Sequence, residues 1–227
     1  MNRTILFTGI ALAVGFSVQA QTIADWTFET SLPNTAGPYS PEVGAGSIIG
    51  SHAGASVYST PAGNGSSHSY SSTLWAVGDY YQIQVSTLGD SDIQLSWNQT
   101  SSGTGPGLFQ LLYSTDGSSF TSFGSAYTVL DNGLAPNAAW NATTASPAYD
   151  FSVDLSGITA LDNQPAVYIR FEDTSTTSSS GGTVGTAGTD RMDNIIVAET
   201  TVPEPSIMAL FGIGSTVCLG FLRRFKK

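Results

Sequence analysis

Alternation of apolar and polar residues with a period of two is the feature of this chain that most restricts its fold. The pattern recurs in five segments between residues 81 and 171. It is typical of a β-strand that turns one face to a core and the other to solvent. The apolar sets are Tyr81/Ile83/Val85, Ile93/Leu95/Trp97, Phe109/Leu111/Tyr113, Phe151/Val153/Leu155 and Val167/Ile169/Phe171.

The segments between these strands agree with an all-β fold. Further strands are expected at residues 23–28 and 192–198, and Asp116-Gly117 is a hairpin signal. Gly-, Ser- and Pro-rich stretches at 101–107 and 174–188 predict loops. No amphipathic helix and no internal repeat is evident between residues 21 and 202. We therefore predict a single antiparallel β-sandwich, jelly-roll-like, over residues 21–201.

The charged residues are distributed very unevenly. Between residues 21 and 202 the only basic residues are Arg170 and Arg191, whereas 16 of the 17 acidic residues lie there, so this interval carries a formal charge of −14. Binding to phosphate backbones needs a basic surface, so we expect no nucleic-acid partner. The distribution also suggests that the two ends are addressing segments and that the interval between them is the working domain.

Residues 1–20 have the three parts of a secretory signal peptide. Arg3 supplies a positive n-region, residues 5–16 form a short apolar stretch, and Val18-Gln19-Ala20 is a small-residue cleavage pattern. We therefore expect a signal helix that is handled by the secretion translocon and removed by signal peptidase. Gln21 would then be the mature N-terminus.

The C-terminal end predicts a transmembrane helix. Residues 207–222 form an apolar run that is followed by a basic cluster at 223–227. The run is slightly short for a bilayer core, but flanking Arg and Lys side chains can extend to the interface. Since basic termini stay cytoplasmic, the β-sandwich should lie outside the inner membrane.

Pro203-Glu204-Pro205, the apolar run and the basic end together resemble the PEP-CTERM sorting signal, here over residues 202–227. The resemblance implies recognition by an exosortase, a membrane-embedded protease or transpeptidase that would cleave near the motif. The protein would then pass from an inner-membrane intermediate to the cell surface, the extracellular matrix or the medium. The family's link to exopolysaccharide makes such a polymer an expected partner.

Asp193 is unusual because it shares parity with Ile195 and Val197 in the last expected strand. If those two residues face the core, so does the carboxylate, which must then be paired or bound to a metal. Pairing with Arg170 or Arg191, or capping of a loop, would satisfy it. Oxygen-rich surroundings in an exported protein favour calcium.

The opening Trp26-Thr-Phe28-Glu29 and the closing Met192-Asp-Asn-Ile-Ile-Val197 resemble the terminal strands of calcium-stabilised jelly-roll carbohydrate-binding modules. The resemblance implies one structural Ca²⁺ that is held by Glu29 and Asp193. No further ligand positions of that family match in the middle of the chain.

The sequence carries no pattern of an enzyme site. His52 and His68 lie in Gly/Ser segments, where solvated loop residues are expected, and the close acid pairs lie in or beside turns. Gly-x-Ser-x-Gly, His-Glu-x-x-His and phosphate-binding loops are absent. Cys218 is the only cysteine, so the domain has no disulfide. We expect no catalytic residue and no cofactor other than Ca²⁺.

Aromatic side chains are the more plausible functional groups. Sugars bind flat rings that have a few polar groups around them. Trp75, Tyr80 and Trp140 have no inward phase in the expected strands and are the candidates for an exposed carbohydrate platform.

We therefore expect an exported structural or adhesive surface protein with a polysaccharide-binding sandwich. The alternatives are an inert structural matrix component and, less favoured, a secreted polysaccharide hydrolase or lyase.

Overall fold

The computed structural model describes residues 19–133 and 135–201. These residues form strands and two short 3-10 helices. The predicted signal helix, apart from its last two residues, and the predicted C-terminal helix at 207–222 lie outside them. The strands are β1 (Gln19–Trp26), β2 (Val43–Gly44), β3 (Gly46–Ser51), β4 (Tyr58–Ser59), β5 (Tyr70–Ser72), β6 (Tyr80–Val85), β7 (Ile93–Ser101), β8 (Leu108–Ser114), β9 (Thr121–Thr128), β10 (Asp150–Asp154), β11 (Val167–Asp173) and β12 (Asp190–Thr201), and the 3-10 helices are η1 (Pro147–Tyr149) and η2 (Thr159–Leu161).

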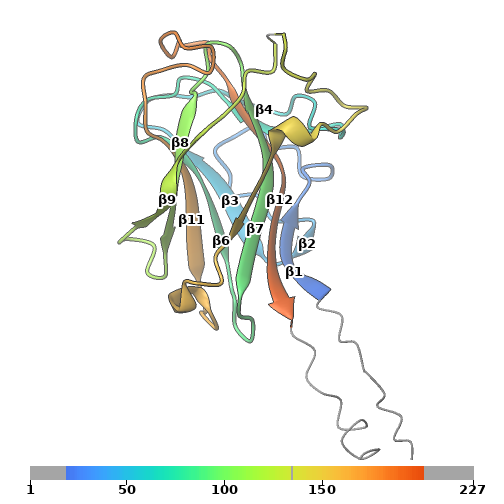
Figure 1. Cartoon of the computed structure of the whole chain (residues 1–227), viewed down its shortest axis with the longest axis vertical. Helices are drawn as coiled ribbons and strands as arrows, with labels where there is room; N and C mark the ends of the chain where they lie inside the picture. The colour runs from blue at the N-terminus through green and yellow to red at the C-terminus, as the bar shows by residue number, and fades with distance from the viewer. Residues whose placement is uncertain (1–18, 134, 202–227) are drawn as a thin grey trace, which may run out of the picture. The chain divides into compact units, whose positions relative to one another are not determined.

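The strands form two sheets that pack as a β-sandwich (Figure 1). The seven-stranded sheet has the order β10-β7-β12-β1-β2, with β5 on β12 and β4 on β5, and the five-stranded sheet has the order β3-β6-β11-β8-β9. From β3 onward the chain passes repeatedly from one sheet to the other, and each strand pair whose register is described is antiparallel. The predicted all-β sandwich is confirmed.

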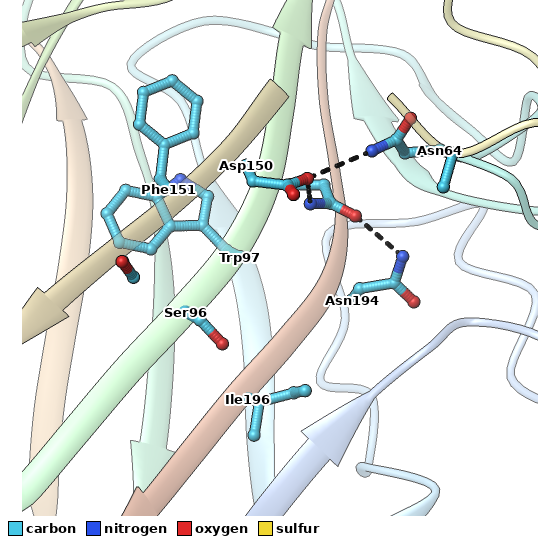
Figure 2. Close-up of a pocket in the computed structure, with 10 residues that line it drawn as sticks. Asn64, Ser96, Trp97, Asp150, Phe151, Asn194 and Ile196 are labelled. Carbon is cyan, nitrogen blue, oxygen red and sulfur yellow. Dashed lines mark hydrogen bonds between the residues drawn. The ribbon is translucent and has the colours of Figure 1, made fainter. Parts of the chain in front are cut away.

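Strand β12 contains an irregularity that determines what lies on the outer face of the seven-stranded sheet. Its register against β7 shifts between Asp193 and Ile196, and Asn194 has φ +47°. Before the shift Met192 packs in the core, and after it Ile195 and Val197 do. A β-bulge inserts one extra residue and so reverses the parity of the strand. Figure 2 shows Asn194 and Ile196 beside one another on β12, on the outer side of the sheet.

The predicted orientation of Asp193 is therefore wrong, although its predicted burial is confirmed. Asp193 pairs with Asn98, which faces outward between Trp97 and Gln99 of β7. Its side chain is 0% exposed because the loop around residues 63–66 covers it, not because it enters the core.

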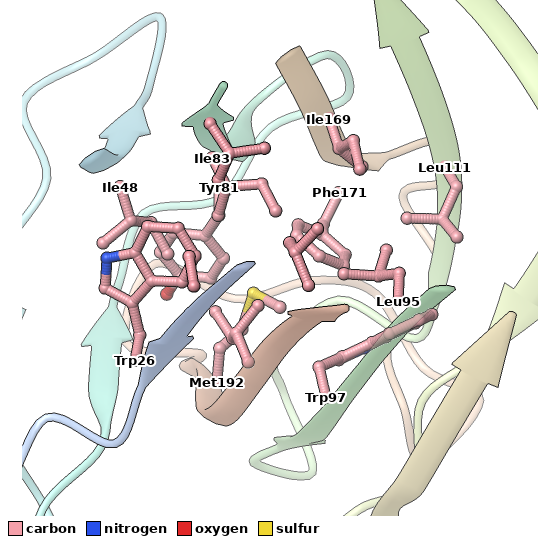
Figure 3. Close-up of a cluster of buried hydrophobic side chains, with 14 of the residues drawn as sticks. Trp26, Ile48, Tyr81, Ile83, Leu95, Trp97, Leu111, Ile169, Phe171 and Met192 are labelled. Carbon is pink, nitrogen blue, oxygen red and sulfur yellow. The ribbon is translucent and has the colours of Figure 1, made fainter. Parts of the chain in front are cut away.

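The core lies between the two sheets and is rich in aromatic rings (Figure 3). Trp97 packs edge-on against Phe171 of the opposite sheet, with 5.1 Å between ring centroids. Each fully buried side chain of this size contributes about 2–3 kcal/mol to the free energy of unfolding. The inward sets that the alternation predicts on β6, β7 and β11 are all buried.

Candidate functional site

The site lies in a groove of about 470 Å³ on the outer face of the seven-stranded sheet. Strands β7, β10 and β12 form its floor, since Ser96, Ser152 and Ile196 occupy outward positions that alternate with core residues. Asn64 and Ala145, from two loops that cover the sheet, line its side. Strand alternation thus supplies a floor of small polar and apolar side chains, and the loops supply a wall.

Three side chains form a hydrogen-bonded row across this floor (Figure 2). Asn194 Nδ2 donates to Asn98 Oδ1 at 2.8 Å, and Asn98 Nδ2 donates to Asp150 Oδ1 at 2.7 Å. Asn64 Nδ2 also points to Asp150 Oδ1, at 3.4 Å. These bonds fix the orientation of every amide in the row. Within residues 19–133 and 135–201, no protein donor reaches Asp150 Oδ2 or Asn194 Oδ1, so both oxygens can accept from a ligand.

Asn194 owes its place in the row to the β-bulge. Its φ of +47° lies in the left-handed region, which asparagine tolerates better than most residues. Bulges commonly re-aim one side chain beside a functional site. The sequence predicted the outward phase of Asn98. It carried no signal that Asn64 and Asn194 would meet the same groove.

Asp193 ties the groove wall to the sheet. Its Oδ2 accepts from Ser66 Oγ at 2.6 Å and from the Asn64 backbone N–H at 2.8 Å, and its Oδ1 accepts from the Asn194 N–H at 2.9 Å. Burial raises the pKa of Asp193 to about 6, against these hydrogen bonds, which lower it. Of the alternatives raised by the sequence, loop capping is observed. In the part of the chain that the structure describes, neither arginine forms an ion pair with Asp193.

Glu29 reaches the same loop from the end of β1. Its Oε1 accepts from the His68 N–H at 2.8 Å, and the negative charge of Glu29 adds to the rise in the pKa of Asp193. The structure therefore brings the two predicted calcium ligands to one loop. No group of three or more His, Cys, Asp or Glu side chains suited to a metal occurs among the described residues.

An oxygen cradle beside Gly63 tests whether calcium fits here. A Cβ on Gly63 would lie 2.0 Å from Ser66 Oγ, 2.2 Å from Asp193 Oδ2 and 2.4 Å from the His68 carbonyl oxygen. Hydroxyl, carboxylate and carbonyl oxygens are the donor types that Ca²⁺ prefers. Ser66, Asp193 and the His68 carbonyl therefore offer suitable donor types at this loop, and Glu29 accepts from the His68 N–H beside them.

The predicted aromatic platform is not formed. Trp75 is 6% exposed and packs against Tyr81 and Phe109 in the core. Trp140 is 8% exposed, and its Nε1 donates to the Ala62 carbonyl oxygen at 2.6 Å, which holds the loop that covers the sheet. The expected exposure of these two rings is wrong, because each buries its face and uses its one N–H on a backbone carbonyl. Tyr80 is half-buried on the other sheet.

One buried row has the atom order of a hydrolase triad. His52 Nδ1 lies 3.0 Å from Asp79 Oδ2, and His52 Nε2 lies 3.1 Å from Ser72 Oγ. Ser72 is 0% exposed, and its hydroxyl also contacts the Tyr81 hydroxyl at 2.7 Å. A nucleophile must be reachable by its substrate, so this row holds the fold together and does not form an active site. The expectation that His52 is a solvated loop residue is wrong.

No helix that is both long and apolar enough to span a bilayer occurs within residues 19–133 and 135–201. The predicted membrane segment at 207–222 lies outside this part of the chain.

Comparison with solved structures finds similar folds at low sequence identity. The K2 cleaved adhesin domain of Lys-gingipain is 15% identical, with a TM-score of 0.46 over 80% of this chain and 98% of that one. The CBM22-2 xylan-binding domain of Paenibacillus barcinonensis Xyn10C is 14% identical, with a TM-score of 0.47 over 78% and 99%. TmCBM61, solved in complex with β-1,4-galactotriose, is 12% identical, with a TM-score of 0.40 over 76% and 94%.

No curated protein matches the sequence. The family model of the PEP-CTERM protein-sorting motif matches residues 201–224, which include Pro203, Glu204 and Pro205. This chain therefore carries a PEP-CTERM sorting motif, which marks it as an exported protein directed to the cell surface.

Proposed function

We propose that the β-sandwich binds an extracellular polysaccharide in the groove of the seven-stranded sheet. The observation that carries this proposal is the oriented row Asn194–Asn98–Asp150. Sugar hydroxyls both donate and accept, and a row of fixed amides and a carboxylate with free outward oxygens complements them. Because the amides are already oriented, a ligand does not have to order them, which favours binding.

Affinity gel electrophoresis against the host's own exopolysaccharide and against neutral dextran and xylan tests this proposal. We expect retardation of the wild-type protein by at least one polymer. Ile196→Trp, which fills the groove floor, should abolish the retardation, and Gln84→Trp on the exposed outer face of the other sheet should leave it unchanged. Retardation that survives Ile196→Trp would place the ligand elsewhere. No retardation of wild-type protein by any polymer would favour the inert structural matrix component.

We also propose the route by which the domain leaves the cell. Residues 1–20 would be removed during export, residues 207–222 would hold an inner-membrane intermediate, and an exosortase would cleave near Pro203-Glu204-Pro205. The match of the sorting motif supports this order. Mass spectrometry of the mature termini tests it. A mature N-terminus at Gln21 and a C-terminus near residue 203 are expected, and intact ends on surface protein would contradict it.

The calcium site remains a separate proposal. One Ca²⁺ bound by Glu29 and Asp193 would join β1, β12 and the loop at 63–68. We expect EGTA to lower the melting temperature of wild-type protein and to have no effect on Glu29→Gln. An identical melting temperature of wild-type protein with excess Ca²⁺ and with EGTA would remove the site.

A further inference from the structure

The outer face of the five-stranded sheet holds one positively charged group in a fixed position. Arg170 lies between the inward residues Ile169 and Phe171 of β11 and so projects outward. Its guanidinium carbon is 3.9 Å from the centroid of the Tyr80 ring and 3.6 Å from that of Phe120. Both rings therefore lie in contact with the guanidinium and hold it in place.

The guanidinium has most of its donors left over. Nε donates to Gln82 Oε1 at 2.8 Å. For Nη1 and Nη2, no protein acceptor and no ion pair is found in residues 19–133 and 135–201, and neither atom is among the buried unpaired atoms there. Their four N–H groups are therefore without a protein partner on a side chain that is only partly buried. Two aromatic rings and one amide have already fixed the rotamer, so little side-chain entropy remains to be lost on binding.

The other arginine of the domain lies in a different environment. Arg191 lies on β12, its Nε is buried without a partner, and burial lowers its pKa. Among the described residues, which contain no lysine, Arg170 is thus the one cation that is held against aromatic rings.

We propose that Arg170 is an anion-recognition point for a carboxylate-bearing sugar, such as a uronate unit of an acidic polysaccharide. A guanidinium that is held by two rings and by one bond at Nε keeps its Nη edge unpaired, and a planar carboxylate matches that edge with two parallel N–H···O bonds. The remaining surface is strongly acidic, so it repels a polyanion except at this point. Specificity for a sugar carboxylate would arise from this contrast.

Glu172 is the residue on this face that opposes the proposal. It lies two positions along β11 on the same side of the sheet; burial raises its pKa, and the positive charge of Arg170 opposes that rise. The two side chains do not approach within ion-pair distance. A bound carboxylate would be repelled by Glu172, so its removal is expected to strengthen binding.

Calorimetric titration of protein purified from the exporting cells tests the site with three polymers of matched length. Polygalacturonate carries carboxylates, dextran sulfate carries sulfates, and dextran is neutral. We expect polygalacturonate to bind more tightly than both others. Arg170→Gln should weaken its binding about tenfold or more, Arg170→Lys should weaken it less, and Glu172→Gln should strengthen it about twofold. Binding of dextran sulfate at equal or higher affinity would overturn carboxylate recognition.

A charge-relocated variant separates the site from general electrostatics. Arg170→Gln combined with Gln84→Arg keeps the net charge and places the cation on the same face, away from the two rings. It should bind no better than Arg170→Gln alone, and recovery of binding would overturn the proposal. If Arg170→Gln lowers the melting temperature strongly, the binding affinity of Arg170→Lys is the test instead. Wild-type affinity in Arg170→Lys would count against recognition by two parallel N–H···O bonds.

The groove proposed above is independent of this site. Ile196→Trp should leave polygalacturonate binding unchanged, and Arg170→Gln should leave any binding of neutral polymers unchanged. The two proposals can therefore fail separately.

Discussion

Replacement of Asp173 by asparagine should stabilise the protein at neutral pH and remove part of the pH dependence of its stability. Asp173 ends β11 and is 1% exposed. Its Oδ1 accepts from the Ser175 N–H at 3.1 Å, whereas Oδ2 is buried with no partner among the described residues. Burial, with smaller contributions from the charges of Asp79 and Glu172, raises the pKa of Asp173 to about 6.

The sign of the effect follows from proton linkage. Between the pKa of the unfolded chain, near 3.8, and about 6, the folded protein holds this proton and the unfolded chain does not. The free energy of unfolding therefore falls as the pH rises through this window and levels off above it. At 1.36 kcal/mol per pKa unit, ionised Asp173 destabilises the native state by about 3 kcal/mol at pH 7. Well below pH 3.8 this contribution vanishes, because aspartic acid is then neutral in both the folded and the unfolded state, as asparagine is.

Urea unfolding of wild-type protein and Asp173→Asn at pH 4, 5, 6, 7 and 8 measures the effect. The variant should gain up to about 3 kcal/mol on wild type between pH 4 and pH 7. Asp154→Asn is a control of opposite sign, since hydrogen bonds from Ser156 lower the pKa of the exposed Asp154. That control should lose stability relative to wild type as the pH rises. Parallel pH profiles for wild type and Asp173→Asn would refute the reasoning.

Three further outcomes follow from the packing and the groove. Asn194→Gly should lower the free energy of unfolding in urea by less than about 0.5 kcal/mol, and Asn194→Ala by about 1 kcal/mol, since φ +47° suits glycine and not alanine. Both variants should weaken polysaccharide binding in gel electrophoresis, and full binding by either would exclude the Asn194 amide as a contact. Phe171→Ala should cost about 3–5 kcal/mol, because the ring is 0% exposed and packs on Trp97; a loss below 1 kcal/mol would mean that the core collapses around the cavity. Ser66→Ala should lower stability by about 1 kcal/mol, because it removes the 2.6 Å bond to Asp193 and leaves that carboxylate short of a donor; an unchanged unfolding midpoint would show that the loop is held without this bond.

Most of the sandwich could be predicted from the sequence because its central strands are buried on one face only. In β11, Val167, Ile169 and Phe171 alternate with Tyr168 and Arg170, and burial follows the same alternation. Burial on one face forces a period of two, so the sequence reveals both the strand and its inward side. The same argument correctly placed Asn98 on the outer face.

Strand β9 was predicted only as the second strand of the hairpin at Asp116-Gly117, and its own extent was not, for the opposite reason. It is an edge strand of the five-stranded sheet, and its residues Thr121–Thr128 are mostly exposed on both faces. An exposed strand needs no alternation, so its sequence of small and polar residues resembles a loop. The bulge at Asn194 was missed because an insertion of one residue leaves the composition of a strand unchanged.

The groove could be predicted only in its parts. Asn98 and Asp150 lie on paired strands, and the predicted phase of β7 and β10 places polar side chains on one face. Asn64 reaches them from a loop that is anchored by Asp193, 129 residues along the chain. Such a contact depends on tertiary packing, and no periodicity or spacing in the sequence signals it. Trp140 illustrates the same limit. It lies outside the expected strands, so the alternation could not show that its ring is buried and that its N–H binds a loop carbonyl.

The acidic side chains explain how a domain with so few basic residues folds. They also explain why Arg170 has no acidic partner among the described residues. Carboxylates serve here as acceptors for loop N–H groups, and among the described residues none forms an ion pair with an arginine. Glu42 accepts from the Thr27 N–H at 3.0 Å, Asp79 from the Ala53 and Ala76 N–H groups at 2.7 Å each, Asp116 from Ser118 and Ser119 at 2.8 and 2.7 Å, and Asp193 from Asn64 and Asn194 at 2.8 and 2.9 Å. A hydrogen bond to an ionised group is stronger than one between neutral groups, so each such contact stabilises a loop without a basic residue. Because these acids are committed to the backbone, none of them neutralises Arg170. The guanidinium of Arg170 is thereby left for an anion that comes from outside the chain.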